Sequence, residues 1–200
     1  MSNVEQRVLV LGGTWFRGRS FCETVFKKGG LQLTLMNRGV TFPNLFPNAP
    51  LIRCNRDSSE ECQTALAGTE WDSIIDFTGQ NDQHIRNIVS SCRFNHYTYV
   101  SSSTVDLSSP SDPLFSMAQN NLWCEHLLQK YVKKLLIVRP GFVCGKNDYT
   151  DRFEELEGKW FWKGTSNLVY PMVRVEMLSN LLVRLVRENR TGIVRAGYYV

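Results

Sequence analysis

An apolar run that leads into a glycine-rich turn is the feature that most constrains how this chain can fold. Residues 8–11 (VLVL) are typical of a short buried strand, and GGTWFRG at 12–18 is typical of a turn that opens a helix. Gly12 permits the tight turn, and Gly18 permits close approach of helix and strand. The free N–H groups and the dipole of such a helix favour an anion. The stretch predicts a phosphate-binding turn; an ordinary glycine-rich connection is the alternative.

Strand-like and helix-like segments alternate along the rest of the chain. This order predicts an α/β fold, in which a doubly wound, Rossmann-type parallel sheet is covered on both faces. The loops at the carboxyl ends of the strands should then face one site. The strands are expected at 8–11, 31–36, 51–53, 71–77, 97–101, 135–138 and 193–196, and the helices at 17–28, 59–66, 84–92, 114–132 and 176–187.

Residues 1–200 are expected to form one domain with little or no separate substrate lobe. The segment 145–172 has no clear periodicity and is expected to be an irregular segment on the substrate side of the site. Its WFW sequence at 160–162 is typical of a core plug or an interface, although stacking on a sugar or base is an alternative.

Composition narrows the classes of function. Apolar residues make up 42% of the chain and charged residues 21%, which fits a packed core and excludes a disordered chain. No apolar run is long enough to span a bilayer and no signal peptide is apparent, so a cytoplasmic protein is expected. Six scattered cysteines and three histidines show no metal-ligand spacing, which predicts reduced thiols and no metal site. The net charge of +4 suits an anionic ligand but is too small to indicate nucleic-acid binding.

The end of the second predicted strand, which reads LMNRG, bears on cofactor choice. NAD sites usually place a carboxylate there on the ribose diol, whereas this chain has Asn37 and Arg38. A guanidinium matches a 2′-phosphate in charge and in bidentate geometry. If a dinucleotide binds, NADP is therefore expected over NAD; a solvated loop cation is the alternative for Arg38.

Several motifs in order resemble those of one protein family. VLVLGGTWFRG, NRG, WDSIIDFTG, YVSSSTVD and VRPGFVCGKNDYTDRF occur along nearly the whole chain. Together they resemble the NAD-dependent epimerase/dehydratase family of extended and atypical short-chain dehydrogenases/reductases. The GGT-x-F-x-G form is similar to a subgroup that includes bacterial nucleoside-sugar-epimerase-like proteins and plastid RNA-binding relatives.

The resemblance implies an NAD(P)-binding Rossmann domain and a set of cofactor-binding positions. Asp57 falls near the position that often contacts adenine, and Trp15 is expected to cover the glycine loop. The implied partners are a dinucleotide and a nucleotide-linked sugar, and a homodimer is left open. The implied cofactor-binding residues are Gly12, Gly13, Thr14, Trp15, Phe16, Arg17, Gly18, Asn37, Arg38, Asp57, Thr78, Gly79, Ser101, Pro140 and Gly141.

The catalytic pattern of the family is incomplete in this chain. Ser102, or its neighbour Ser103, matches the catalytic Ser/Thr, but no Tyr-x-x-x-Lys pair occurs anywhere. Met117 stands at the expected Tyr and Asn121 at the expected Lys; Met cannot transfer a proton and Asn supplies no charge. General acid–base catalysis contributes about 10²–10⁴ in rate, so the sequence predicts a degenerate site that binds or senses its cofactor.

Two other functions stay open at this point. The first is an active NADP-dependent epimerase or reductase that acts on a nucleotide-linked sugar with Ser102 and a substitute acid/base, for which Tyr149 and Tyr170 are candidates. The second is RNA binding, by analogy with the plastid relatives.

Other residues of reactive type are expected to be structural. Cys144 has no histidine placed to activate it. Asp72 and Asp76 flank a strand. His84, His96 and His126 are interpreted as ordinary surface or core histidines.

Overall fold

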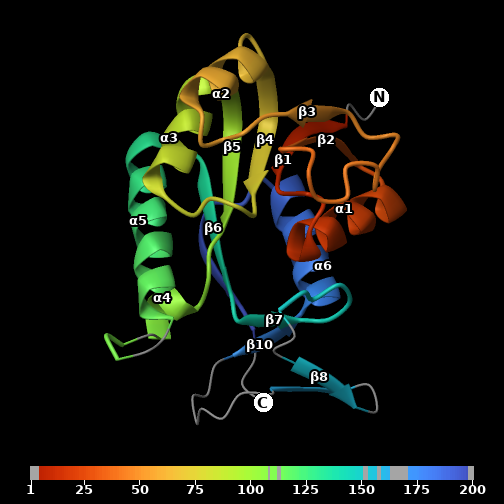
Figure 1. Ribbon diagram of the computed structural model, residues 1–200, viewed down its shortest axis with the longest axis vertical. Coiled ribbons are helices and arrows are strands. Elements are labelled where there is room, and N and C mark those ends of the chain that lie inside the picture. Colours follow the sequence, from red (N-terminus) through yellow and green to blue (C-terminus); the bar gives the residue numbers. More distant parts are fainter. Residues whose placement is uncertain are drawn as a thin grey trace.

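A seven-stranded parallel sheet forms the centre of the computed structural model, which describes residues 5–107, 109–111, 114–150, 153–156, 159–162 and 171–197. The strand order is β11-β6-β5-β4-β1-β2-β3 (Figure 1). The bounds are β1 Gln6–Leu11, β2 Leu31–Asn37, β3 Leu51–Arg53, β4 Glu70–Asp76, β5 Arg93–Val100, β6 Leu135–Pro140 and β11 Gly192–Ala196.

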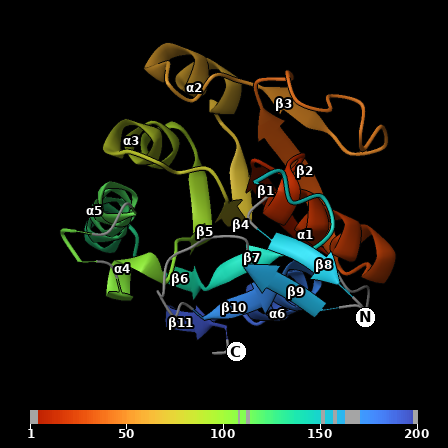
Figure 2. The same cartoon turned by 60° about the horizontal axis from the view of Figure 1, so that its bottom comes forward.

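Helices cover both faces of this sheet (Figures 1 and 2). Successive side chains of β1 explain why: Val8 and Val10 belong to one buried cluster, and Leu9 and Leu11 belong to another. The first cluster holds α1 and α6, and the second holds α2, α3 and α5. The bounds are α1 Phe16–Lys28, α2 Ser59–Leu66, α3 Asp82–Ser91, α4 Thr104–Leu107, α5 Phe115–Tyr131 and α6 Val175–Arg187.

Local sequence explains where several helices begin and end. The Ser58 side chain accepts a hydrogen bond from the Glu61 amide at the start of α2, and Asn81 does the same for the His84 amide at α3. Helix α1 ends where Gly29 adopts a φ of 67°, a conformation that other residues rarely take. These caps fix the lengths of the crossovers that connect the parallel strands.

The predicted doubly wound α/β fold is confirmed, but the expectation of an irregular 145–172 segment is wrong in part. Strands β8 (Phe153–Leu156) and β9 (Lys159–Trp162) form an antiparallel pair. Strands β7 (Phe142–Cys144) and β10 (Met172–Arg174) pair in parallel just beyond the main sheet. Strands of three or four residues are too short for an alternation of apolar and polar side chains to stand out in the sequence.

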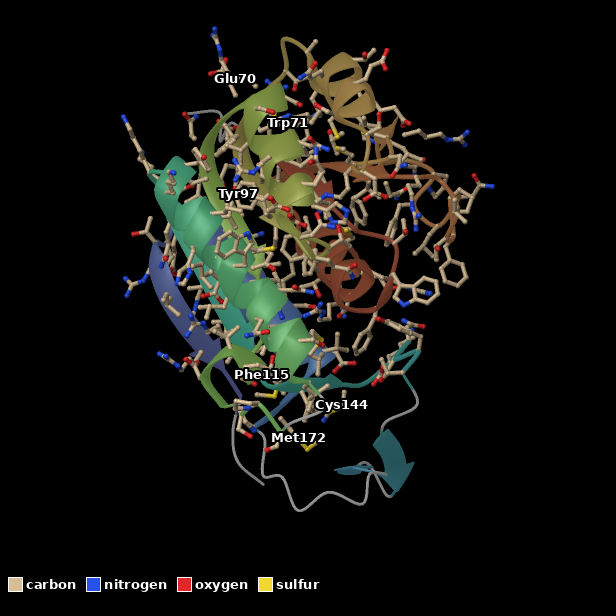
Figure 3. The ribbon with its side chains drawn as sticks, turned by 60° about the vertical axis from the view of Figure 1, so that its left-hand side comes forward. Glu70, Trp71, Tyr97, Phe115, Cys144 and Met172 are labelled. Carbon is tan, nitrogen blue, oxygen red and sulfur yellow. The ribbon has the colours of Figure 1, made fainter. Side chains whose placement is uncertain are left out.

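The strand order reverses at β1, which pairs with β2 on one side and β4 on the other. A crevice opens at such a switch point, outside the carboxyl ends of the strands. Figure 3 shows this axis of the molecule: Glu70 and Trp71, which begin β4, lie at the opposite end from Phe115, Cys144 and Met172. The amino end of α5 and the small β7–β10 sheet therefore belong to the carboxyl side, where a ligand is expected.

Candidate functional site

The glycine-rich turn after β1 is packed so tightly that only glycine fits at two of its positions. Gly12 has a φ of +83°, and a Cβ there would lie 2.2 Å from the Thr78 Cγ2 atom. A Cβ on Gly18 would lie 2.1 Å from the backbone oxygen of Gly12. Gly18 thus lets α1 begin directly against the turn, as the sequence predicted.

The amino end of α1 is left open for an anion. Trp15 occupies the N-cap position but its side chain makes no capping hydrogen bond, and the first turn contains no acidic residue. The first N–H groups of a helix have no partner within the helix, and its dipole favours negative charge at this end. The turn therefore has the geometry of a phosphate site.

A cavity of about 670 Å³ opens in front of this turn, at the carboxyl ends of β1, β2 and β4. Of the predicted cofactor residues it is lined by Gly12, Thr14, Trp15, Phe16, Arg17, Gly18, Asn37, Arg38, Asp57 and Thr78. Asn37 uses its Oδ1 atom to accept from the Gly39 amide at 2.7 Å, and its Nδ2 atom is buried without a hydrogen-bond partner. That side chain holds the start of the loop that carries Arg38.

A second cavity, of about 430 Å³, adjoins the first. The two share lining residues, among them Arg17, Gln80 and Tyr149. Predicted residues from the ends of β4, β5 and β6 and from helix α5 meet in this second cavity: Gly79, Ser101, Ser102, Met117, Asn121, Pro140 and Gly141. Gly13 lines neither cavity; a Cβ there would meet the Leu35 side chain at 2.9 Å, so it packs behind the turn.

Ser102 is held with its oxygen as an acceptor. Its Oγ accepts from the Thr104 amide at 3.3 Å and from the Thr104 hydroxyl at 3.0 Å. Its own hydroxyl hydrogen is therefore available to an acceptor in the second cavity.

Met117 and Asn121 stand in the same cavity, on α5. Met117 is 41% exposed and contributes no proton-transfer group. The hydroxyl of buried Tyr99 donates to the Gly79 oxygen at 2.7 Å and lies 3.0 Å from the Asn121 Oδ1 atom. Burial raises the pKa of Tyr99, so this phenol stays protonated. Tyr99 thus serves to hold Asn121 and the loop after β4.

A buried ion pair lies one turn beyond Asn121 on α5. The Glu125 carboxylate accepts from Arg139 and, at 2.6 Å, from the Ser101 hydroxyl. The pKa of Arg139 is raised, chiefly because its guanidinium donates hydrogen bonds to Glu125. This network fixes the end of β5 and of β6 beside the second cavity, and it makes Ser101 a structural residue whose hydroxyl is already engaged.

Sequence reasoning missed Arg56, which is central to the first cavity. Its guanidinium pairs with Asp76 and donates to the Thr78 hydroxyl at 3.0 Å. Burial, the largest single effect, would raise the pKa of Asp76. The charge and hydrogen bonds of Arg56, together with hydrogen bonds from Thr78 and Tyr97, outweigh burial and hold that pKa below its usual range. Asp76 was expected to be structural, and its full burial fits that interpretation. No local sequence motif connects Arg56 with Asp76.

His84 was interpreted as an ordinary histidine, and the structure corrects this. It lines the first cavity, and its Nε2 atom lies 2.6 Å from the Asp57 Oδ1 atom. The Gln80 amide donates to the His84 Nδ1 atom at 3.4 Å. Asp57 is thereby held at the cavity wall. A signal was present in the sequence, since His84 follows the loop after β4 by only a few residues.

Three aromatic side chains pack together beside the first cavity, and two of them, Trp15 and Tyr149, line it. The ring of Trp15 lies 4.9 Å from that of Tyr149 and 5.9 Å from that of Phe42. They come from three different loops, and all three are exposed. Trp15 was expected to cover the glycine loop, and it stands in the cavity wall beside that loop.

Of the remaining candidates, the described Cys144 and His96 carry no reactive geometry. Cys144 is 2% exposed, and burial raises its pKa to about 11. His96 is buried between the Ser73 hydroxyl and the Arg190 carbonyl. Tyr170 lies outside the described residues, as do the side chains at 160–162. Across the described ranges, no three metal-binding side chains gather, and no helix has the length and apolar character needed to cross a membrane.

Comparison with known proteins bears on the fold. No protein-family model matches the chain. Solved structures that superpose on it include a short-chain dehydrogenase/reductase from Veillonella parvula (13% identity, 97% of this chain and 94% of that one, TM-score 0.72). Another is the UDP-glucose 4-epimerase of Thermus thermophilus in complex with NAD (17% identity, 96% and 77%, TM-score 0.73). The chain has the fold of the NAD(P)-binding short-chain dehydrogenases/reductases and epimerases.

One curated protein is similar in sequence. It is the chloroplast stem-loop binding protein of 41 kDa b from Arabidopsis thaliana, 24% identical over 168 residues. The alignment covers 72% of this chain and 44% of that protein, so the chain spans less than half the length of the curated relative that it matches. A further solved neighbour, a wide-type short-chain dehydrogenase/reductase from Veillonella parvula, is in complex with NADP (13% identity, 96% of this chain and 94% of that one, TM-score 0.70).

Proposed function

We propose that the chain is a single Rossmann-type domain that binds a nicotinamide dinucleotide across the two adjoining cavities. The observation that carries this proposal is the turn at Gly12 and Gly18, whose packing leaves the amino end of α1 uncapped and open to a pyrophosphate. The adenosine half would lie in the larger cavity, near Asp57 and Arg38. The nicotinamide half would lie in the smaller cavity, near Ser102 and Pro140.

The residues present fit such a cofactor, and they favour NADP over NAD. Arg38 lines the cavity at the end of β2, where NAD-binding proteins usually carry a carboxylate. With Asn37 beside it, this position would neutralise a 2′-phosphate and would offer nothing to repel one. When bound, the nicotinamide supplies hydride transfer, and the chain supplies its binding and orientation.

The residues of the second cavity favour binding or sensing over ordinary turnover as the function. Met117 and Asn121 line the second cavity, and the resemblance implies that they stand at the positions of the family's proton donor and lysine. The Tyr99 hydroxyl contacts the Asn121 side chain at 3.0 Å, but deep burial keeps that phenol protonated and hydrogen-bonded to protein groups. A sensor needs only different affinities for the oxidised and reduced cofactor in two conformations.

Isothermal titration with NADP, NADPH, NAD and NADH tests this function directly. Saturable binding of at least one cofactor below millimolar concentration is expected, with NADP forms tighter than NAD forms. Absence of binding by all four at millimolar concentration would exclude the proposal.

An active epimerase or reductase on a nucleotide-linked sugar is the second candidate. Tyr149 lines both cavities, and its phenol shares the second one with Ser102. Tyr149 would then replace the missing proton donor. NADPH oxidation or epimerisation with UDP-glucose, lost in both Ser102→Ala and Tyr149→Phe, would establish this function. Activity that survives Tyr149→Phe would exclude Tyr149 as the proton donor.

A further inference from the structure

The thiols of Cys54 and Cys62 form a pair beneath the larger cavity. Their sulfur atoms lie 3.5 Å apart, which is hydrogen-bonding distance for two thiols. Cys54 follows β3 and lines the cavity, whereas Cys62 lies inside α2 with no exposed surface. All six cysteines are described, and no other two sulfur atoms are in such contact. The pair thus connects the cavity wall to the helix behind it.

We propose that Cys54 and Cys62 are a redox modification site at which a peroxide forms a disulfide that weakens ligand binding in the larger cavity. The effect on binding rests on the proposed function; the formation of the disulfide does not. Cys54 is 4% exposed and faces the cavity, which gives a small oxidant a route to this sulfur. Cys62 is then the resolving thiol.

The chemistry balances with hydrogen peroxide as the oxidant. The Cys54 thiolate attacks one peroxide oxygen, so that an S–O bond forms, the O–O bond breaks and the leaving hydroxide takes a proton to become water. The Cys62 sulfur then attacks the sulfenic sulfur of Cys54, so that the S–S bond forms and the S–O bond breaks with release of a second water. The two thiols lose two electrons in total, and these reduce the peroxide.

Burial sets the rate of this reaction. It raises the pKa of the Cys54 thiol to about 12 and that of Cys62 above its ordinary value. The thiolate is therefore scarce at neutral pH, and oxidation should accelerate tenfold for each unit of pH up to about pH 10. A dinucleotide that fills the cavity should also slow the first step, because it covers Cys54.

The disulfide affects binding through the segment between the two cysteines. A disulfide has an S–S distance of about 2.05 Å, so the two sulfur atoms must approach each other by roughly 1.5 Å. Cys62 is fixed inside α2, so most of this movement falls on Cys54 and the residues that follow it. Asn55 and Asp57 of that segment line the cavity and would be drawn back from it.

Peptide mapping of the whole chain decides whether the disulfide forms. Reduced protein is treated with hydrogen peroxide at pH 8.5, the remaining thiols are alkylated, and trypsin cuts after Arg53, Arg56 and Arg86. The expected product joins peptide 54–56 to peptide 57–86 and disappears with dithiothreitol. It should be absent in Cys54→Ser and Cys62→Ser and present in the control Cys22→Ser, which removes a buried thiol from another cluster. Failure of this product to form while other cysteines are oxidised would overturn the proposal.

Titration with NADPH then measures the effect on the cavity. Oxidised wild-type protein should bind about tenfold more weakly than reduced protein, and dithiothreitol should restore the affinity. Cys62→Ser treated with peroxide should keep its affinity. A disulfide that forms without any change in affinity overturns the regulatory part of the proposal. If reduced protein binds no dinucleotide at all, the proposed function fails, and the peptide map still decides the modification site.

Discussion

The guanidinium of Arg56 donates to both carboxylate oxygens of Asp76, and each of the two N···O distances is 2.8 Å. Asp76 ends β4 with no exposed surface, and Arg56 belongs to the loop after β3, where 12% of its side chain is exposed. The hydroxyl of buried Tyr97 donates to the same carboxylate at 2.8 Å. This cluster joins two of the loops that form the larger cavity.

Removal of the Asp76 charge should therefore destabilise the fold. Asp76→Asn leaves the buried Arg56 charge without its counter-ion, and we expect the free energy of unfolding at pH 7 to fall by about 3–5 kcal/mol. Urea unfolding followed by circular dichroism measures the change. The matched control is Asp72→Asn on the same strand; Asp72 accepts from the Arg7 amide at the surface, and its loss should cost about 1 kcal/mol or less.

The same pair predicts how stability depends on pH. Because Arg56 and the other hydrogen-bond donors around Asp76 together hold its pKa below its usual range despite burial, the unfolded state, with a pKa near 3.9, binds the proton more readily than the folded state does. The stabilisation is complete above the unfolded pKa and is lost as the pH falls through the folded pKa. Unfolding free energies measured from pH 6 to pH 2 should show a drop below about pH 4 that is smaller in Asp76→Asn. Equal drops in both proteins would contradict this assignment.

Gly18 should be required for binding. Gly18→Ala would place a methyl group 2.1 Å from the Gly12 backbone oxygen, so the turn or the start of α1 must shift. We expect affinity for NADPH to fall by at least a hundredfold. Gly68→Ala is the control: Gly68 has a φ of +69° but open space around it, so that variant should lose about 1 kcal/mol of stability and no affinity.

Arg38 should determine the preference between the two cofactors. Loss of a charge-assisted contact to a phosphate costs about 1.5–3 kcal/mol, so Arg38→Ala should weaken NADP binding by about ten- to a hundredfold and leave NAD binding within twofold. The control is Arg53→Ala, which removes a neighbouring arginine that does not line the cavity. An equal loss of affinity for NADP and NAD would mean that Arg38 contacts some other part of the ligand.

Trp15 offers an optical signal for binding. Its ring stands in the wall of the larger cavity in contact with Tyr149, so a bound dinucleotide should quench its fluorescence. The quenching should be lost in Trp15→Phe. It should persist in Trp123→Phe, which removes another exposed tryptophan, on α5. Quenching that survives Trp15→Phe would place the ligand elsewhere.

The sequence predicted the main sheet well because its strands are long apolar runs between helices with regular spacing. All of the predicted cofactor-binding residues except Gly13 line one of the two cavities, since parallel strands bring their carboxyl ends together regardless of how far apart they lie in the chain. It did not reveal Arg56, because the partner of that charge is on another strand and no local pattern couples the two. The pairing of β8 with β9 was missed for a different reason: two strands of four residues carry too little periodicity to be read.

The position of β1 between β2 and β4 has a consequence for how the protein folds. Val8 pairs with Leu33 on one side and with Ser73 on the other. The first strand therefore completes its pairing only when β4, a segment much later in the chain, is present. Such distant pairings form slowly, because a long loop must close before any contact compensates for the lost chain entropy. Loops from both sides of β1 line the larger cavity. A partly folded chain therefore forms only part of this cavity. The ability to bind a ligand should then appear late in refolding, as β4 docks, and a bound ligand should slow unfolding more than it speeds folding.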